Sequence, residues 1–188
     1  MKKTFDTEKK FYTLSLLVKD IPGVLSQVAR LFSRKGYNIE SIVSGETDRP
    51  GITRITIVMQ GDEVIIGQIT AQLRKLLCVI SVKLLSPESA VQRELVLVKV
   101  RAETKDKRDE IIQVVNVFRA SIVDISRETL TVVILGSESK AGALMDLLAD
   151  FGILEVVRTG TIAIERGRNT IYDNNKEKGE FDYGKNVL

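Results

Sequence analysis

The residues best suited to chemistry in this chain form a short corner between an apolar run and an amphipathic stretch. The apolar run ends at Asp20, and Ile21-Pro22-Gly23 leads into the amphipathic stretch. A glycine at such a corner lets the backbone approach a ligand closely, and a helix start presents unpaired N–H groups and a positive dipole. The corner therefore suits a small anion such as an amino-acid carboxylate, and it favours sensing of a metabolite over its conversion.

Missing residue types exclude several kinds of active site. The 188 residues contain no histidine and no tryptophan, and Cys78 is the single cysteine. A histidine-activated nucleophile cannot be built, and a zinc site is disfavoured. No Walker-type or GxGxxG pattern supports a nucleotide cofactor. We therefore expect no catalytic residues and no metal site, and we expect Cys78 to be a buried thiol because it lies in an apolar run.

Net charge and hydropathy limit the classes of partner and the cellular location that the sequence predicts. Lys plus Arg number 28 and Asp plus Glu number 25, so the net charge is +3, which is too balanced to indicate a nucleic-acid partner. No apolar run approaches the roughly 18 residues that cross a membrane, and the first ten residues lack the apolar core of a secretory signal. The sequence predicts a cytoplasmic protein that binds neither nucleic acid nor membrane.

Apolar periodicity predicts the same order of elements twice. In residues 11–86 the order is strand, helix, strand, strand, helix, strand, with Pro22 in the first turn of the first helix and Gly36 at its left-handed C-cap. The predicted strands are 11–18, 39–44, 52–59 and 79–85, and the helices are 22–35 and 64–76. The second half predicts strands at 95–102, 122–125, 130–135 and 154–164, with helices at 106–118 and 137–151.

Two copies of one order of elements define the expected fold and domains. The class is α+β, with two tandem ferredoxin-like βαββαβ domains built on antiparallel sheets. The expected parts are an N-terminal extension (1–10), a first domain (11–86), a second domain (91–165) and a polar tail (166–188) too poor in apolar residues to form a core.

One face of each predicted sheet lacks a helix layer. On that face Leu17, and in the second domain Leu95 and Leu97, are expected to be exposed in a single chain. A domain of this size buries only about 60% of its unfolded surface and is marginal alone. We therefore predict association into at least a homodimer.

The strand–DxPGVLxxV–helix–GxNIxS pattern inside βαββαβ resembles an ACT domain, a small-molecule regulatory module of amino-acid metabolism. Longer runs are similar to the small, regulatory subunit of acetolactate synthase (acetohydroxyacid synthase), and this resemblance covers about residues 11–165. The runs that carry it are 23–26, 31–41, 72–76 and 93–100.

The resemblance implies a regulatory role. Such a chain has no active site of its own and activates a large catalytic subunit, which holds thiamine diphosphate, Mg²⁺ and FAD, none of them bound by the small subunit. It also confers feedback inhibition by a branched-chain amino acid in valine, leucine and isoleucine biosynthesis, with valine the first candidate. The effector would lie between the ACT domains of a homodimer, contacted by Asp20, Gly23, Val24 and Leu25 of one chain and by Asn38 and Ile39 of the other.

The chemistry of these residues agrees with the implied site. The effector carboxylate can accept hydrogen bonds from N–H groups at 23–25, and its ammonium can meet Asp20 or the amide oxygen of Asn38, while the apolar members line the side-chain pocket. Simpler roles remain open: Asp20 could cap the helix, and Asn38 could merely tolerate a tight turn after Gly36.

Three other functions remain open for this sequence. A stand-alone ACT-type amino-acid sensor would bind the same effector without a catalytic partner. An RRM-like RNA-binding protein shares the βαββαβ order but needs aromatic rings on its central strands, and 52–59 and 93–102 contain none. An independent enzyme is disfavoured by the missing histidine.

Overall fold

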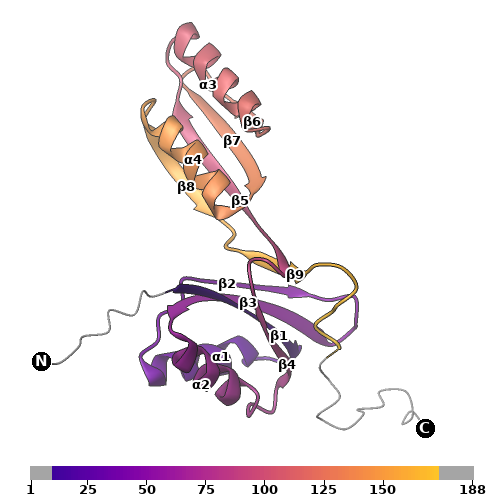
Figure 1. Cartoon of the computed structure of the whole chain (residues 1–188). Helices are drawn as coiled ribbons and strands as arrows, with labels where there is room; N and C mark the ends of the chain where they lie inside the picture. The colour runs from indigo at the N-terminus through magenta and orange to yellow at the C-terminus, as the bar shows by residue number, and fades with distance from the viewer. Residues whose placement is uncertain (1–9, 174–188) are drawn as a thin grey trace, which may run out of the picture. The chain divides into compact units, whose positions relative to one another are not determined.

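The computed structural model describes residues 10–173, which form two compact units (Figure 1). Of the described residues, the first unit holds 10–91 and 163–173, and the second holds 92–162. Each unit has the order βαββαβ around an antiparallel sheet. The predicted class, two tandem ferredoxin-like domains, is confirmed.

The first unit is a four-stranded sheet in the order β2-β3-β1-β4, with all pairs antiparallel. This order places the first and third strands at the centre. Its elements are β1 (Lys10–Lys19), α1 (Val24–Lys35), β2 (Ser41–Glu46), β3 (Ile52–Gly61), α2 (Glu63–Leu73) and β4 (Val79–Leu85).

The second unit repeats the order as β6-β7-β5-β8. Its elements are β5 (Ala90–Arg101), α3 (Lys105–Val117), β6 (Ser121–Ile125), β7 (Thr129–Gly136), α4 (Glu138–Ala149) and β8 (Ile153–Arg158). A further strand, β9 (Ile162–Glu165), pairs with β5. The prediction of one continuous strand over 154–164 is wrong, because the chain leaves β8 at a turn in which Gly160 has φ +83°, a conformation that interrupts a strand.

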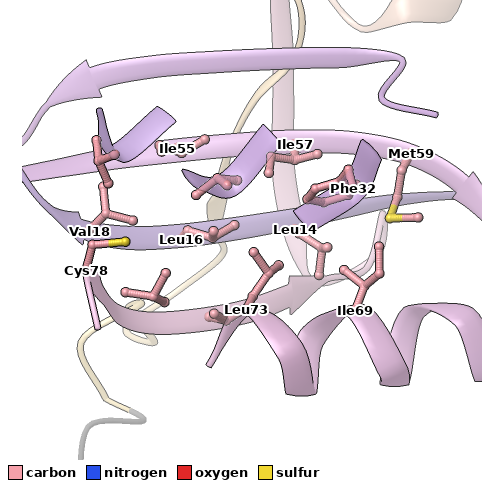
Figure 2. Close-up of a cluster of buried hydrophobic side chains, with 14 of the residues drawn as sticks. Leu14, Leu16, Val18, Phe32, Ile55, Ile57, Met59, Ile69, Leu73 and Cys78 are labelled. Atoms are coloured by element: carbon pink, nitrogen blue, oxygen red, sulfur yellow. The ribbon is translucent and has the colours of Figure 1, made fainter. Parts of the chain in front are cut away.

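The core of the first unit lies between α1, α2 and one face of the sheet (Figure 2). Alternate residues of the central strands point to this face, as the period of two requires. Cys78 is 3% exposed here, so the prediction of a buried thiol is confirmed. The side chains labelled in Figure 2 are Leu14, Leu16, Val18, Phe32, Ile55, Ile57, Met59, Ile69, Leu73 and Cys78.

Glycines bound the first helix. Gly36 ends α1 in the left-handed conformation (φ +68°), and its N–H bonds to carbonyls of the last turn, which confirms the predicted C-cap. The helix begins at Val24, two residues later than predicted, with Gly23 as its N-cap. Pro22 therefore lies in the turn before the helix and not in its first turn.

The second helix begins with a side-chain cap that offers a test of the fold. A carboxylate oxygen of Asp62 accepts a 2.8 Å hydrogen bond from the Ile65 N–H. Asp62→Ala is expected to lower the free energy of unfolding by about 1 kcal/mol, as measured by urea denaturation. Asp62→Asn keeps an acceptor, so its free energy of unfolding should remain within a few tenths of a kcal/mol of the wild-type value. Equal losses of stability in the two variants would contradict the capping role.

The face of the first sheet opposite the helices is covered, which the sequence did not predict. Leu17 is 1% exposed, so the expectation that it would be exposed in a single chain is wrong. The cover is residues 163–173, which group with the first unit, whereas the expected boundary of the second domain was 165 and the tail began at 166. Leu95 of the second unit is 36% exposed, as expected, and Leu97 is half-buried. The remaining tail (174–188) and residues 1–9 of the extension lie outside the described residues.

Candidate functional site

The elbow between β1 and α1, residues 20–23, is open toward solvent. Gly23 has φ +82° and ψ 3°, and a Cβ built on it would meet nothing within 4 Å. No side chain caps α1. The N–H of Val24 donates to the Ile21 carbonyl at 3.3 Å. Because the other N–H groups in the first turn of a helix have no intrahelical acceptor, the elbow still presents donors and a positive dipole to an external acceptor.

The other described helices begin differently. Asp62, Thr104 and Ser137 each accept a hydrogen bond from an N–H in the first turn of α2, α3 and α4. In the second unit, α3 occupies the place of α1, and Thr104 is its N-cap. The two units share a fold. At the corner between their first strand and first helix they differ in whether a side chain accepts a hydrogen bond from the N–H groups of the first helical turn.

Asp20 does not cap α1, so that simpler role is excluded. Its backbone N–H donates a 2.8 Å hydrogen bond to the Gly51 carbonyl in the turn between β2 and β3. The side chain is exposed, and within residues 10–173 its carboxylate makes no hydrogen bond or ion pair. The backbone bond fixes the elbow, and the carboxylate stays free for a cation.

The apolar residues of the predicted site differ in burial. Val24 is 8% exposed and belongs to the core, whereas Leu25 is 43% exposed. Ile39 is half-buried and packs against the same core. Leu25 is therefore more accessible to a ligand than Val24, and Ile21, within the elbow itself, is equally exposed at 43%.

The segment after α1 holds two polar groups that sequence reasoning overlooked. Asn38 Nδ2 donates to Glu40 Oε1 at 3.0 Å, so the amide oxygen of Asn38 is left for another donor. Glu40 was visible in the sequence as a carboxylate two residues from Asn38. Ser41 Oγ is buried without a hydrogen-bond partner among the described residues, and an unmet buried hydroxyl costs about 1–3 kcal/mol.

The two predicted sets of site residues lie at opposite ends of α1. Asp20 to Leu25 stand at its start, and Asn38 and Ile39 follow its end. A helix of 12 residues is about 18 Å long, which exceeds the length of a free amino acid. Within one chain the two sets cannot contact the same small ligand.

Other kinds of site have less support in the part of the chain that the structure describes. Residues 10–173 contain no group of three or more side chains arranged to hold a metal ion, and none of their helices is both long and apolar enough to span a membrane. Of the central strands, β3, β5 and β7 carry no aromatic residue, whereas β1 carries Phe11 and Tyr12 near its start. On the covered sheet face of the first unit, Ser15 and Leu17 are at most 1% exposed, so this face offers no platform for stacking bases.

Comparisons with known proteins agree with the architecture. Residues 14–81 match the model of the AHAS small subunit-like ACT domain, and residues 93–167 match that of the small subunit of acetolactate synthase. The chain is 48% identical over 166 residues to the probable acetolactate synthase small subunit of Methanothermobacter thermautotrophicus, covering 88% of this chain and 99% of that one. It is 46% identical over 156 residues to the acetolactate synthase small subunit of Mycobacterium leprae, covering 83% and 92%.

A solved structure extends the likeness to the backbone. The crystal structure of the acetolactate synthase small subunit from Thermotoga maritima matches with a TM-score of 0.78 and 40% identity, over 85% of this chain and 99% of that chain. Fold and elbow together define a two-domain protein of the ACT class. The chain belongs to the acetolactate synthase small subunit family.

Proposed function

We propose that this chain is the regulatory subunit of an acetolactate synthase. It binds and activates a separate catalytic subunit, and it confers feedback inhibition by a branched-chain amino acid, with valine the first candidate. The observation that carries the proposal is the uncapped start of α1 at Gly23, in a chain of this family. The chemistry of acetolactate formation, with thiamine diphosphate, Mg²⁺ and FAD, belongs to the catalytic subunit, and we place the complex in the cytoplasm.

The effector is held by complementary charges at the elbow. Its carboxylate accepts hydrogen bonds from the first N–H groups of α1, where the helix dipole favours an anion. Its ammonium meets the free carboxylate of Asp20, and the amide oxygen of Asn38 offers a second acceptor. Leu25 and Ile39 contact the aliphatic side chain.

The site requires two chains. Because the residues before and after α1 stand at opposite ends of that helix, the elbow of one protomer must face Asn38 and Ile39 of a second protomer. An amino acid bound between them favours one arrangement of the pair. The catalytic subunit is then held in a less active form, with a coupling of about 1–3 kcal/mol.

Reconstitution tests the proposal. The purified chain is mixed with the catalytic subunit from its own organism, and acetolactate formation is measured with and without valine, leucine and isoleucine. We expect the chain to raise the rate and at least one amino acid to lower it, with each methylene of the effector worth about 1–3 kcal/mol of discrimination. Amino-acid binding without any effect on the catalytic subunit would favour a stand-alone sensor, and absence of both binding and activation would refute the proposal.

A further inference from the structure

Residues 163–173, here called the strap, run along the face of the first sheet opposite α1 and α2 (Figure 1). Two strands hold its backbone through polar side chains. Arg54 Nη2 of β3 donates to the Ala163 carbonyl at 2.8 Å, and Ser81 Oγ of β4 donates to the Ile171 carbonyl at 3.1 Å. Lys83 pairs with the Glu165 carboxylate and donates to the Thr170 carbonyl at 3.1 Å.

These anchors lie in two neighbouring rows on one face of the sheet. In the register of the strands, Leu17 stands between Arg54 and Ser81, and Ser15 stands next to Lys83. Arg54 also donates to Ser15 Oγ at 3.0 Å, and burial lowers the pKa of its guanidinium while Tyr172 and Glu165 oppose the shift. Ile171 is 3% exposed. The strap is thus a packed part of the first unit and not a solvated tail.

The end of the strap contacts the turn between β2 and β3. The Tyr172 hydroxyl donates to Asp48 Oδ1 at 3.1 Å, and the Arg49 guanidinium lies 3.7 Å from the centre of the Tyr172 ring. Thr47 Oγ1 accepts from the Arg49 N–H at 3.2 Å and donates to the Ile52 carbonyl at 2.9 Å. This turn is therefore stabilised by hydrogen bonds of its own as well as by the contact with Tyr172.

The same turn also holds the backbone of the elbow. The carbonyl of Gly51 accepts the N–H of Asp20 at 2.8 Å, and Gly51 is two residues from Arg49. Tyr172 and Asp20, far apart in sequence, are thus joined through four consecutive residues, 48–51. A displacement of this short braced turn shifts the acceptor that holds Asp20.

From these contacts we infer that Tyr172 is a positioning residue for the effector elbow. With the strap docked, Tyr172 holds the turn at 48–51 where Gly51 fixes the backbone of Asp20, and this sets the affinity for the amino acid. The inference rests on the proposed function, because it assigns a second, distant determinant to the same site.

Binding measurements on the full chain test the inference. Tyr172→Phe removes the hydroxyl donor and is expected to weaken the affinity for the effector, measured by calorimetry with valine, leucine and isoleucine, by about three- to tenfold, the usual worth of one hydrogen bond. Tyr172→Ala also removes the ring that contacts Arg49 and should weaken the affinity for the effector further. Asp48→Ala should match Tyr172→Phe, whereas Asp48→Asn keeps an acceptor and should restore most of the affinity.

A second readout follows the backbone directly. Hydrogen exchange of the Asp20 amide, measured by NMR without ligand, should be faster in Tyr172→Ala than in wild type, while exchange in β7 should not change. Thr104→Ala is the matched control, because it weakens a cap on α3 in the second unit and touches neither strap nor turn. It should alter neither the affinity nor exchange at Asp20.

The outcomes separate the two proposals. If wild type binds an amino acid and the Tyr172 and Asp48 variants bind it equally well, the inference is overturned and the effector site stands. Unchanged exchange at Asp20 in Tyr172→Ala also overturns it. If wild type binds none of the three amino acids in the presence of the catalytic subunit, the effector site fails, and with it the positioning role.

Discussion

Gly23→Asp is expected to abolish amino-acid inhibition while leaving activation of the catalytic subunit intact. The new carboxylate would lie at the start of α1, where the effector carboxylate is proposed to bind, and would both repel it and compete for its N–H donors. Aspartate tolerates the left-handed backbone better than most residues, and no atom lies within 4 Å of the added Cβ. Affinity should fall by about 100-fold, equivalent to roughly 2.7 kcal/mol, in calorimetric titration.

Gly23→Asn provides the matched control for charge. It has nearly the same size and the same tolerance of the left-handed conformation, but it is neutral. We expect a smaller loss of affinity, because the repulsion is gone and competition for the donors remains. Full sensitivity of Gly23→Asp to every branched-chain amino acid would show that the elbow is not the effector site.

Phe32→Ala is expected to produce the largest loss of stability. Phe32 is 1% exposed and projects from α1 among Leu14, Ile57 and Met59 (Figure 2). Removing a buried aromatic ring costs about 3–5 kcal/mol, from lost transfer energy and from the cavity left behind. Since a domain is typically stable by about 5–15 kcal/mol, urea denaturation should show a much lower midpoint for the first unit.

Leu77→Ala is the corresponding surface control. Leu77 lies in the same unit and is 94% exposed, so its truncation should change stability by less than about 0.5 kcal/mol. Similar losses for the two variants would mean that the core between α1, α2 and the sheet does not hold this unit together.

The two units share one fold but differ at the start of their first helix. In the first unit, a glycine in the left-handed conformation begins α1 and no side chain occupies its donors. In the second unit, the Thr104 hydroxyl accepts a hydrogen bond from the Lys107 N–H and caps the start of α3. We therefore expect one effector elbow per chain, and effector binding should survive Thr104→Ala unchanged.

Much of this architecture could be predicted from local patterns. The period of two in β1 and the apolar stripe of α1 determine which faces are buried, because burial of apolar surface dominates folding. Gly36 predicted the end of α1, because few other residues adopt a positive φ without strain. The repeated order of elements predicted two ferredoxin-like domains, and the runs around Gly23 and Asn38 predicted the family.

Tertiary structure decided the rest. The strap carries no periodic apolar pattern, and its bonds to Arg54, Ser81 and Asp48 join residues 90 to 124 positions apart, so no local signal marks it. For the same reason the burial of Leu17 and the bond between Asp20 and Gly51 were not predictable. Local sequence sets which conformation each segment prefers, whereas the partner of a polar side chain is set by which distant backbone folding brings within hydrogen-bond distance.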